Sequence, residues 1–331
     1  MDRLLMRSWC VATNLVLYPL LAACVAAPPA QHGGDQIVNL YDAFGPESED
    51  LIQDFGFSAL VRYQGKTILF DAGTNADVLK ANAEALGVDL AEVDFAVASH
   101  AHFDHINGFD YLLEVNPDVK IYFPADMFWG MNVEFDLTGA EEGVAASLAP
   151  EQRYFGGTKE QVMFRQSGRF WGADVEFVSD HTKIGPGMTL IATRSPFIGY
   201  FTSYPTIRGA GDRPDDSSQV KTTGLPELSL NLEGPRGDVL MVGCSHSQVE
   251  TIVRTTNAHL GRAIGLVYGG YHMLPYTSAE IRGVADRMRD ELGVIGVAPA
   301  HCSGHAAFSV FGDVFGEDYH LAGLGTTTAF P

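Results

Sequence analysis

Cysteine and basic residues are both scarce in this chain of 331 residues. The four cysteines, at positions 10, 24, 244 and 302, are too few and too far apart for a small disulfide-stabilised domain. Lys and Arg number 21 against 41 Asp and Glu. Such an acidic chain lacks the extended positive surface that binds DNA or RNA phosphates, so nucleic acid is not an expected partner.

Long apolar runs are absent after the first 24 residues. Two arginines precede an apolar run over Trp9–Ala23, an arrangement typical of a secretory signal, and the run is too short and interrupted for a retained transmembrane helix. Leu21-Ala22-Ala23-Cys24 resembles a bacterial lipobox. We therefore expect residues 1–23 to be a lipoprotein signal peptide and Cys24 to carry the lipid. The alternative is ordinary cleavage near Ala26–Ala30, which discards Cys24.

The predicted anchor defines the organisation of the rest of the chain. A lipid on Cys24 would attach the exported protein to a membrane, in the bacterial periplasm or at the outer membrane. Residues 24–36 contain two prolines and two glycines without a periodic pattern, which predicts a flexible tether. Residues 37–331 are expected to form one domain.

The apolar pattern of this domain predicts an α/β fold. Short strands come first, strands then alternate with helices, and two β-rich stretches each followed by helices fit a four-layer αββα sandwich. The expected strands are Ser58–Tyr63, Thr67–Phe70, Phe95–Ala98, Val239–Val242, Ile264–Tyr268 and Val294–Val297. The expected helices are Ala76–Leu86 and two that open at the capping boxes Ser247-x-x-Glu250 and Thr277-x-x-Glu280.

An aromatic-rich stretch at about 126–180 interrupts this alternation. It is expected to be an insertion that covers a pocket. Its aromatic residues include Phe128, Trp129, Phe135, Tyr154, Phe155, Phe164, Phe170 and Trp171.

Four potential metal ligands follow the expected strand Phe95–Ala98: His100, His102, Asp104 and His105. In an extended chain, residues two apart point to the same side, so the first three of these side chains can converge on one pocket. Imidazole suits zinc, and a carboxylate adds a harder ligand that neutralises charge. The segment therefore predicts a catalytic zinc or iron site.

These residues resemble the H-x-H-x-D-H signature of the metallo-β-lactamase superfamily. Ile68–Gly73 resembles the family's first motif, in which an Asp at a strand end orients the metal loop. Gly243–Ser247, Gly269–His272 and Pro299–Gly304 resemble one branch, which includes 7,8-dihydropterin-6-yl-methyl-4-(β-D-ribofuranosyl)aminobenzene-5′-phosphate synthases and phosphodiesterase-like hydrolases. The resemblance extends from about Asp54 to the C-terminus, apart from the aromatic stretch and Ser195–Thr223, and implies the αββα sandwich with two metal ions.

The resemblance also implies a set of metal ligands. His100 and His102 match the first-metal pair, and Asp104 and His105 match the second-metal pair. The completing ligands are less direct, because the Gly-His-Thr segment of the wider superfamily has no counterpart near residues 192–196. The branch instead implies that His246 completes the first site and that His301 completes the second.

Four further roles follow from the resemblance. Asp71 is expected to support the metal ligands rather than to bind metal. Cys244 either bridges the metals as a thiolate or is a small buried residue, free or paired with Cys302 in a disulfide. Asp104 and His272 are the expected catalytic residues, with His272 stabilising developing charge or binding substrate. The alternatives for His272 are a hydrogen-bonded core histidine and, in exchange with His246, the third ligand of the first metal.

Together these features predict an exported metal-dependent hydrolase in which a metal-bound hydroxide attacks a phosphoester, lactone or related ester of a small molecule. Absence of a G-x-S-x-G segment disfavours a serine hydrolase, and the missing Gly-His-Thr segment disfavours β-lactams as substrates. Two divalent cations are expected, zinc first, with manganese or iron as alternatives. The alternative functions are an iron-dependent oxidoreductase on the same fold and a lipid-anchored binding protein that contains metal. The oligomeric state is not predicted.

Overall fold

Two mixed β-sheets pack face to face in the computed structural model, which describes residues 34–125, 133–136, 143–159, 161–164, 170, 173–203 and 221–331. In spatial order, the first sheet contains β15 (Thr327–Ala329), β1 (Gln36–Tyr41), β2 (Ser58–Tyr63), β3 (Lys66–Phe70), β4 (Phe95–Val97), β5 (Lys120–Pro124) and β8 (Asp174–Val178). The second contains β14 (Gly296–Ala300), β13 (Ile264–Gly270), β12 (Asp238–Val242), β11 (Lys221–Leu232), β10 (Met188–Ser203) and β9 (Thr182–Gly185). β6 (Val133–Asp136) and β7 (Gln161–Phe164) pair as a separate two-stranded antiparallel sheet.

Helices cover the outer face of each sheet. Near the first sheet lie α1 (Ala76–Ala85), η1 (Leu90–Glu92), α2 (Phe103–Ile106) and α3 (Phe109–Val115). The second sheet is covered by α5 (Val249–Leu260), α6 (Ser278–Asp286), the π-helical turn η5 (Arg287–Glu291) and α7 (His305–Phe315). The shorter elements are α4 (Val144–Ser147), η2 (Pro150–Gln152), η3 (Tyr154–Gly157), η6 (His301–Ser303) and η7 (Gly316–Asp318).

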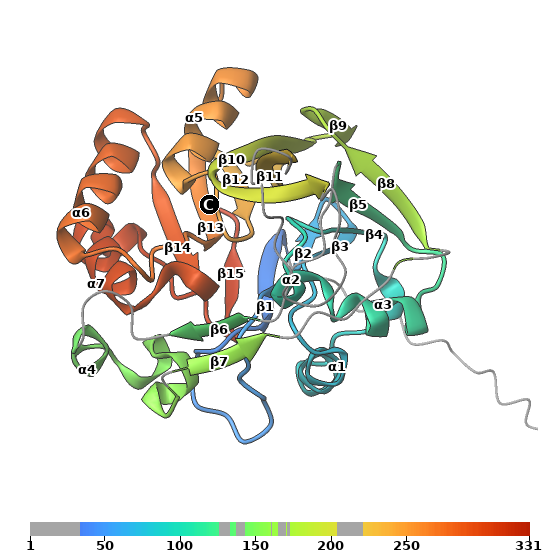
Figure 1. Cartoon of the computed structure of the whole chain (residues 1–331), viewed down its shortest axis with the longest axis horizontal. Coiled ribbons are helices and arrows are strands. Elements are labelled where there is room, and N and C mark those ends of the chain that lie inside the picture. The colour runs from blue at the N-terminus through green and yellow to red at the C-terminus, as the bar shows by residue number, and fades with distance from the viewer. Residues whose placement is uncertain are drawn as a thin grey trace, which may run out of the picture. The chain divides into compact units, whose positions relative to one another are not determined.

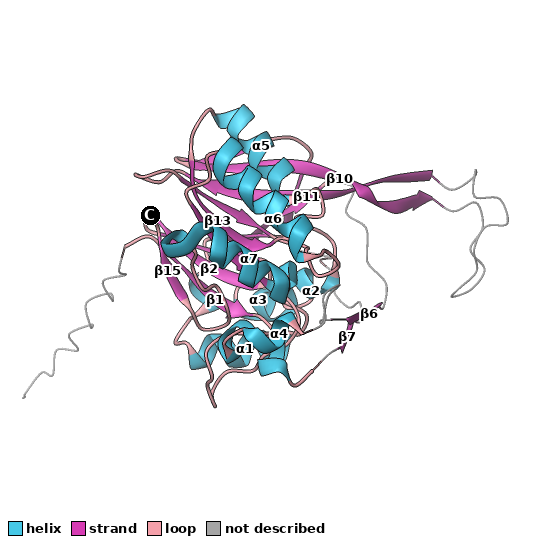
Figure 2. Cartoon of the chain, turned by 90° about the vertical axis from the view of Figure 1, so that its left-hand side faces the viewer, coloured by secondary structure: helices cyan, strands magenta, loops and turns pink. Residues whose placement is uncertain are grey.

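The sheets and the helices that cover them are shown in Figure 1. Three clusters of buried apolar side chains hold these four layers together. The central cluster fills the space between the sheets, with residues such as Val61 from β2 and Met241 from β12. The second cluster joins α5, α6 and α7 to the second sheet, and the third joins α1 and α3 to the first. The structure is therefore the predicted four-layer αββα sandwich. The hairpin of β10 and β11 continues beyond the second sheet (Figure 2).

The parallel strands of both sheets place the metal-binding motifs. β3, β4 and β5 run parallel, and so do β12, β13 and β14. All five residues of β12 are buried, as expected for a strand covered on both faces. Because the carboxyl ends of parallel strands lie at one edge of a sheet, the loops after these strands gather at one edge of the sandwich.

Most predicted elements are present, with three differences. The last predicted strand, 294–297, lies at 296–300 as β14. β8 falls within the predicted insertion but pairs with β5 as an edge strand of the first sheet. The capping box at Thr277 is confirmed, whereas that at Ser247 is wrong: α5 begins at Val249 without a side-chain cap. The Ser247 hydroxyl instead donates to the buried carboxylate of Glu227.

Several predictions fall outside the described residues. These are the signal peptide at 1–23, the lipid site Cys24 and the tether as far as residue 33, together with Phe128, Trp129 and Trp171. Residues 34–331 belong to one compact unit. Within the described part of the chain, no helix has both the length and the apolar character needed to cross a membrane.

Candidate metal centre

The predicted metal ligands meet at the edge of the sandwich where the parallel strands end. The loop after β4 carries His100, His102, Asp104 and His105, with the last two in α2. The loop after β12 supplies Cys244 and His246, and η6 directly after β14 supplies His301. Both sheets therefore contribute ligands to one centre, and the apolar core between the sheets sets the distance across it.

The first cluster consists of three imidazoles. His102 Nδ1 lies 3.0 Å from His100 Nε2 and 3.1 Å from His246 Nε2. Ligand atoms at the corners of a tetrahedron around zinc are about 3.3–3.4 Å apart when each bond is about 2.0–2.1 Å long. The three nitrogens are therefore spaced to share one cation.

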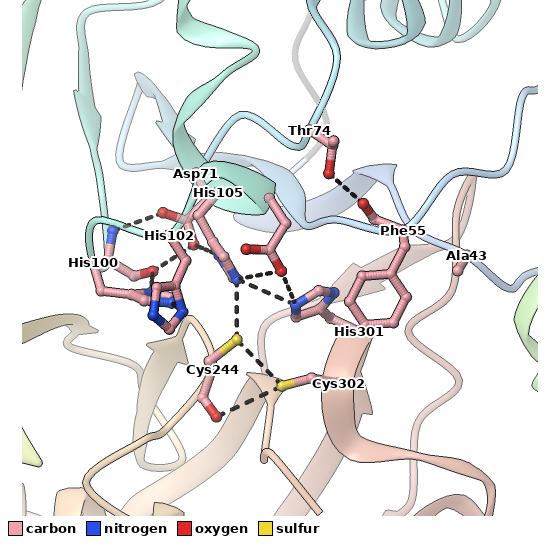
Figure 3. Close-up of polar contacts among 12 residues, drawn as sticks. Ala43, Phe55, Asp71, Thr74, His100, His102, His105, Cys244, His301 and Cys302 are labelled. Carbon is pink, nitrogen blue, oxygen red and sulfur yellow. Dashed lines mark hydrogen bonds and ion pairs between the residues drawn. The ribbon is translucent and has the colours of Figure 1, made fainter. Parts of the chain in front are cut away.

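The second cluster combines a carboxylate with two imidazoles (Figure 3). His301 Nε2 lies 3.2 Å from His105 Nε2 and 3.2 Å from Asp104 Oδ2, and the remaining side of this triangle is 3.6 Å. These separations again match the edges of a tetrahedron around one cation.

Cys244 lies between the two clusters. Its Sγ atom is 3.1 Å from His105 Nε2 in the second cluster, and it also lies within reach of His100 and His246 in the first. Figure 3 shows the sulfur below His105, pointing toward the centre. A thiolate here has the position of a ligand common to both cations, which the sequence predicted as one alternative.

The protonation of the first cluster and of Asp104 suits metal binding. Burial, followed by the neighbouring imidazoles, lowers the pKa of His100 and of His246 well below the usual value, and burial lowers the pKa of His102 to about 4. Burial opposes ionisation of Asp104, but the charges of His105 and His301 outweigh it and lower its pKa. Neutral imidazoles and an ionised carboxylate are the forms that bind divalent cations. Three neutral imidazole nitrogens that face one another are also better satisfied by a cation than by protons. Burial lowers the pKa of His301, but Cys302 and Asp104 outweigh burial and raise it to about 9, so His301 must lose a proton when a cation binds.

Asp71 orients a histidine of each cluster, His105 directly and His100 through Ser99. Its Oδ2 atom lies 2.6 Å from His105 Nδ1 and accepts the Ser99 hydroxyl at 2.7 Å. Ser99 Oγ lies 2.8 Å from His100 Nδ1. The two histidines therefore hold their protons on Nδ1 and turn Nε2 toward the centre. Asp71 has the supporting position that the sequence predicted.

Glycine is required where the two sheets approach each other at this centre. A Cβ atom on Gly243 would lie 2.0 Å from Ser99 Oγ and 3.2 Å from Asp71 Oδ2. Any larger residue would push the loop after β12 away from the loop after β4. Gly243 therefore allows Cys244 and His246 to reach the ligands of the first sheet.

Comparison with known proteins identifies the fold family. Residues 51–194 match the metallo-beta-lactamase superfamily. The crystal structure of Tm1679, described as a metal-dependent hydrolase of the beta-lactamase superfamily, has a TM-score of 0.63 and 23% sequence identity, covering 89% of this chain and 98% of that one. Residues 51–194 thus match a metallo-β-lactamase superfamily domain, and the solved structure has the same fold.

Two curated relatives come from Methanocaldococcus jannaschii. One is named 7,8-dihydropterin-6-methyl-4-(beta-D-ribofuranosyl)-aminobenzene-5′-phosphate synthase; it is 24% identical over 308 residues, which cover 89% of this chain and 96% of the relative. The other is an uncharacterized protein, 25% identical over 256 residues, covering 77% of this chain and 86% of the relative. The resemblance to the metallo-β-lactamase superfamily and to this synthase branch is thus confirmed.

The structure also distinguishes the position of His246 from that of His272. His246 groups with His100 and Cys244, whereas His272 groups with Cys244 and Cys302. The rings of His246 and His272 are 4.2 Å apart. Among the described residues, His272 Nδ1 is buried without a hydrogen-bond partner. The position therefore favours His246 as the third member of the first cluster and leaves His272 beside it.

The two cysteines of the domain are free thiols. The Sγ atoms of Cys244 and Cys302 lie 3.3 Å apart, and the Cys302 thiol also contacts the Cys244 carbonyl at 3.7 Å. The disulfide considered as an alternative is not formed. Cys302, whose sulfur was not assigned to the metal centre from the sequence, thus lies at its border.

Glu227 is a functional position that the sequence did not reveal. This buried residue of β11 accepts the backbone N–H of His246 at 2.7 Å and that of Ser247 at 2.6 Å. Its carboxylate also accepts the Ser247 hydroxyl at 2.7 Å, and Ser195 Oγ donates to the His246 carbonyl at 2.6 Å. Burial raises the pKa of Glu227 despite these hydrogen bonds. The loop that carries His246 is thus held from the neighbouring strands.

Asp42 has the same relationship to the second cluster. Its fully buried carboxylate follows β1 and accepts the backbone N–H of His301 at 3.0 Å and that of Ala43 at 2.8 Å. Burial raises the pKa of Asp42 to about 7. A sequence signal was present, because Tyr41-Asp42-Ala43 repeats the aromatic-Asp-Ala pattern of Phe70-Asp71-Ala72 at the end of another strand.

The predicted aromatic insertion contributes to the border of the centre. Tyr154 and Phe155 are buried against Phe44 and Phe308. The Gly304 backbone N–H donates to the Tyr154 hydroxyl at 2.9 Å, and the Tyr154 N–H donates to His305 Nε2 at 3.1 Å. This segment therefore braces the start of α7, directly after the loop that carries His301. His305 itself has the structural role expected of a histidine outside the ligand motifs.

Backbone strain is concentrated at the same strand ends. Asp71, Ser245, His272 and His301 all have positive φ, between 48° and 60°. Such conformations are costly for residues other than glycine and persist where the surrounding structure fixes them. Here the strained residues lie in the loops that bring side chains from both sheets together at the metal centre.

Proposed function

We propose that this chain is a metal-dependent hydrolase that holds two divalent cations, zinc first among them, and acts on a phosphoester, lactone or related ester. The observation that carries the proposal is the pair of three-residue clusters with Cys244 between them. The first cluster contains only imidazoles and the second contains a carboxylate, so the two cations would lie in different electrostatic environments. A centre of this kind supplies acidified water and stabilises negative charge when both cations are bound.

The residues of this chain have distinct parts in that chemistry. His100, His102 and His246 would hold one cation, and Asp104, His105 and His301 would hold the other. Asp71 keeps the protons of His100 and His105 away from the centre. The Nε2 atoms of His100 and His105, which face the centre, are then unprotonated and can bind a cation.

His272 is proposed to interact with the substrate. It lies beside His246, and its Nδ1 atom has no hydrogen-bond partner among the described residues. An imidazole in this position can donate to negative charge that develops on the substrate. Asp104 is proposed as the catalytic carboxylate that would hold one cation beside the reacting ester group.

The proposed substrate range is supported by the name of one relative and by the absence of a G-x-S-x-G segment. The named relative from Methanocaldococcus jannaschii is a synthase of a phosphate-containing pterin compound, which supports a phosphoester as one substrate class. No G-x-S-x-G segment is present, so attack by water rather than by a serine is proposed. We further propose that the protein is exported and anchored through Cys24.

The decisive experiment combines metal analysis with a panel of phosphodiesters, phosphomonoesters, lactones and β-lactams. We expect two equivalents of zinc or manganese per chain, hydrolysis of an ester, and loss of activity after chelation that zinc restores. A single iron with oxygen consumption would instead establish an oxidoreductase. Two bound metals without turnover of any compound in the panel would favour a binding protein.

A further inference from the structure

A cavity of about 550 Å³ lies beside the first metal cluster, between the beginnings of α5 and α6. His246 and His272 line its inner end. Its walls are largely apolar and include Val249, Met273 and Val284. Cavities of this size and character hold a small organic group rather than a solvated ion.

The charges around this cavity do not favour an anion. Among the described lining residues, Arg287 is the one lysine or arginine, and its guanidinium already binds Glu250, with Nε and a terminal nitrogen each 2.8 Å from Oε2. Glu250 and Glu280 bring two carboxylates to the same walls. Away from His246 and His272, a negatively charged group would therefore find no lysine or arginine free to pair with it and would face like charge.

The helix ends that face the cavity also do not favour an anion. The beginning of a helix attracts anions because its first N–H groups lack partners. At α6, the Glu280 carboxylate accepts the Thr277 N–H and the Thr277 hydroxyl, each at 2.9 Å. At α5, no side chain caps the first turn, but Glu250 lies in that turn and brings a carboxylate to it. An anion would therefore meet a capped helix end at α6 and a like charge at α5.

We propose that this cavity binds the uncharged organic group of the substrate, so that the enzyme prefers esters with a neutral aryl group there and rejects those with an anionic one. The proposal rests on the proposed hydrolytic function and adds the substrate class. The ester group itself would lie at the two clusters, next to His246. Burial of an aromatic ring in the cavity supplies the preference, and the Glu250–Arg287 pair supplies the rejection.

Three p-nitrophenyl phosphodiesters test this proposal with the zinc-loaded full chain. Their second ester group is methyl, phenyl or 4-carboxyphenyl. Burial of the phenyl ring is expected to make kcat/KM about tenfold higher for the phenyl ester than for the methyl ester, while the 4-carboxyphenyl ester is at least about tenfold poorer than the phenyl ester. Equal values for the phenyl and methyl esters would overturn the proposal.

Two variants locate the preference in the cavity. Ala279→Phe fills it and is expected to lower the ratio of kcat/KM for the phenyl ester to that for the methyl ester about tenfold. Ala258→Phe, on exposed α5 surface outside the cavity, is the matched control.

Glu250→Gln frees Arg287 and is expected to raise the ratio of kcat/KM for the carboxyphenyl ester to that for the phenyl ester about fivefold or more. Its control is Asp313→Asn, which frees Arg282 of α6, a residue outside the cavity lining. Unchanged ratios in both cavity variants would contradict the proposal.

Binding measurements separate this proposal from the hydrolytic function. The same methyl, phenyl and 4-carboxyphenyl groups are attached to methylphosphonate as monoesters that serve as inert ligands, and their Kd values are measured by calorimetry. If no diester is hydrolysed but the phenyl ligand binds about tenfold more tightly than the other two, the proposed hydrolytic activity fails and the cavity assignment stands. If the three ligands bind equally, the cavity assignment is wrong whatever the activity.

Discussion

The carboxylate of Glu227 accepts the backbone N–H of His246 at 2.7 Å, so a residue of β11 positions a predicted metal ligand in the loop after β12. The same carboxylate binds both the N–H and the hydroxyl of Ser247. Three donors therefore converge on one buried anion. This arrangement makes the first metal cluster dependent on a side chain that does not bind metal.

Glu227→Gln is expected to weaken binding of the first cation about 10–100-fold, because outer residues that orient metal ligands have effects of this size. The amide places an N–H group against one of the three donors, and a buried donor left unsatisfied costs about 1–3 kcal/mol in the free energy of unfolding. Metal titration and chemical denaturation measure the two effects. Glu233→Gln, at an exposed site just beyond the same strand, is the matched control. Unchanged affinity for both cations would show that Glu227 does not act through His246.

Separate alanine variants distinguish His246 from His272. His246→Ala is expected to lose one of two metal equivalents, because two neutral imidazoles hold zinc poorly. His272→Ala is expected to keep both metals and to lower kcat, because His272 groups with Cys244 and Cys302 and not with His100 and His246. Mass spectrometry of dialysed protein gives the stoichiometry. If the metal loss occurs in His272→Ala instead, the two roles must be exchanged.

His102→Ala and Asp104→Ala are each expected to reduce turnover more than about 100-fold, beyond the upper range for loss of a residue that only supports a ligand. The fold should remain, because the ligands lie in strand-end loops and the apolar core lies between and outside the sheets. Circular dichroism beside activity and metal content tests this. Full activity in a variant that has lost metal would refute the proposed mechanism.

The first metal loop and the layering of the fold could be predicted from sequence because both depend on local patterns. His100, His102 and Asp104 alternate directly after a buried strand, and apolar periodicity marks the strands and helices that surround them. Tertiary contacts are what the sequence could not show. Glu227 lies in β11 between apolar neighbours, and its partners are 19 and 20 residues away in the loop after β12.

Ser247 shows how a tertiary contact overrides a local pattern. Ser247-x-x-Glu250 has the same spacing as Thr277-x-x-Glu280, yet the second forms a capping box and the first does not. The difference is the buried carboxylate of Glu227, which binds the Ser247 hydroxyl. Thr277 lies at an exposed helix end without such a competitor, so its side chain caps α6.

Cys24 provides a test of the predicted export. Mass spectrometry of membrane-extracted protein is expected to find a lipid-modified N-terminus at Cys24. Stable anchoring needs more than one acyl chain, so the modification should carry several. Cys24→Ala should move the protein out of the membrane fraction, whereas Cys10→Ala, within the predicted signal peptide, should not. An unmodified N-terminus beyond Cys24 in a soluble fraction would contradict the prediction.

His305 is expected to make the stability of the protein sensitive to acid. It is buried beside the Tyr154 backbone N–H, which donates to its Nε2 atom. Burial, followed by the nearby Arg153, lowers the pKa of His305 to about 4. The unfolded chain has a histidine pKa of about 6.5, so between these two values the unfolded state binds a proton that the folded state does not. The contribution of His305 is therefore complete above pH 6.5 and falls as the pH decreases toward 4.

His305→Gln removes this titration while its side-chain oxygen can still accept the Tyr154 N–H. Between pH 6.5 and 4, the free energy of unfolding of the zinc-loaded wild type should fall more steeply than that of the variant, by at most about 1.4 kcal/mol per pH unit, which corresponds to one proton. Denaturant titrations at several pH values in this window measure both slopes. His259→Gln, at an exposed histidine of α5 that belongs to neither cluster, serves as the control. Because the difference in slope must come from His305, identical slopes in wild type and His305→Gln would show that His305 can become protonated in the folded protein without cost.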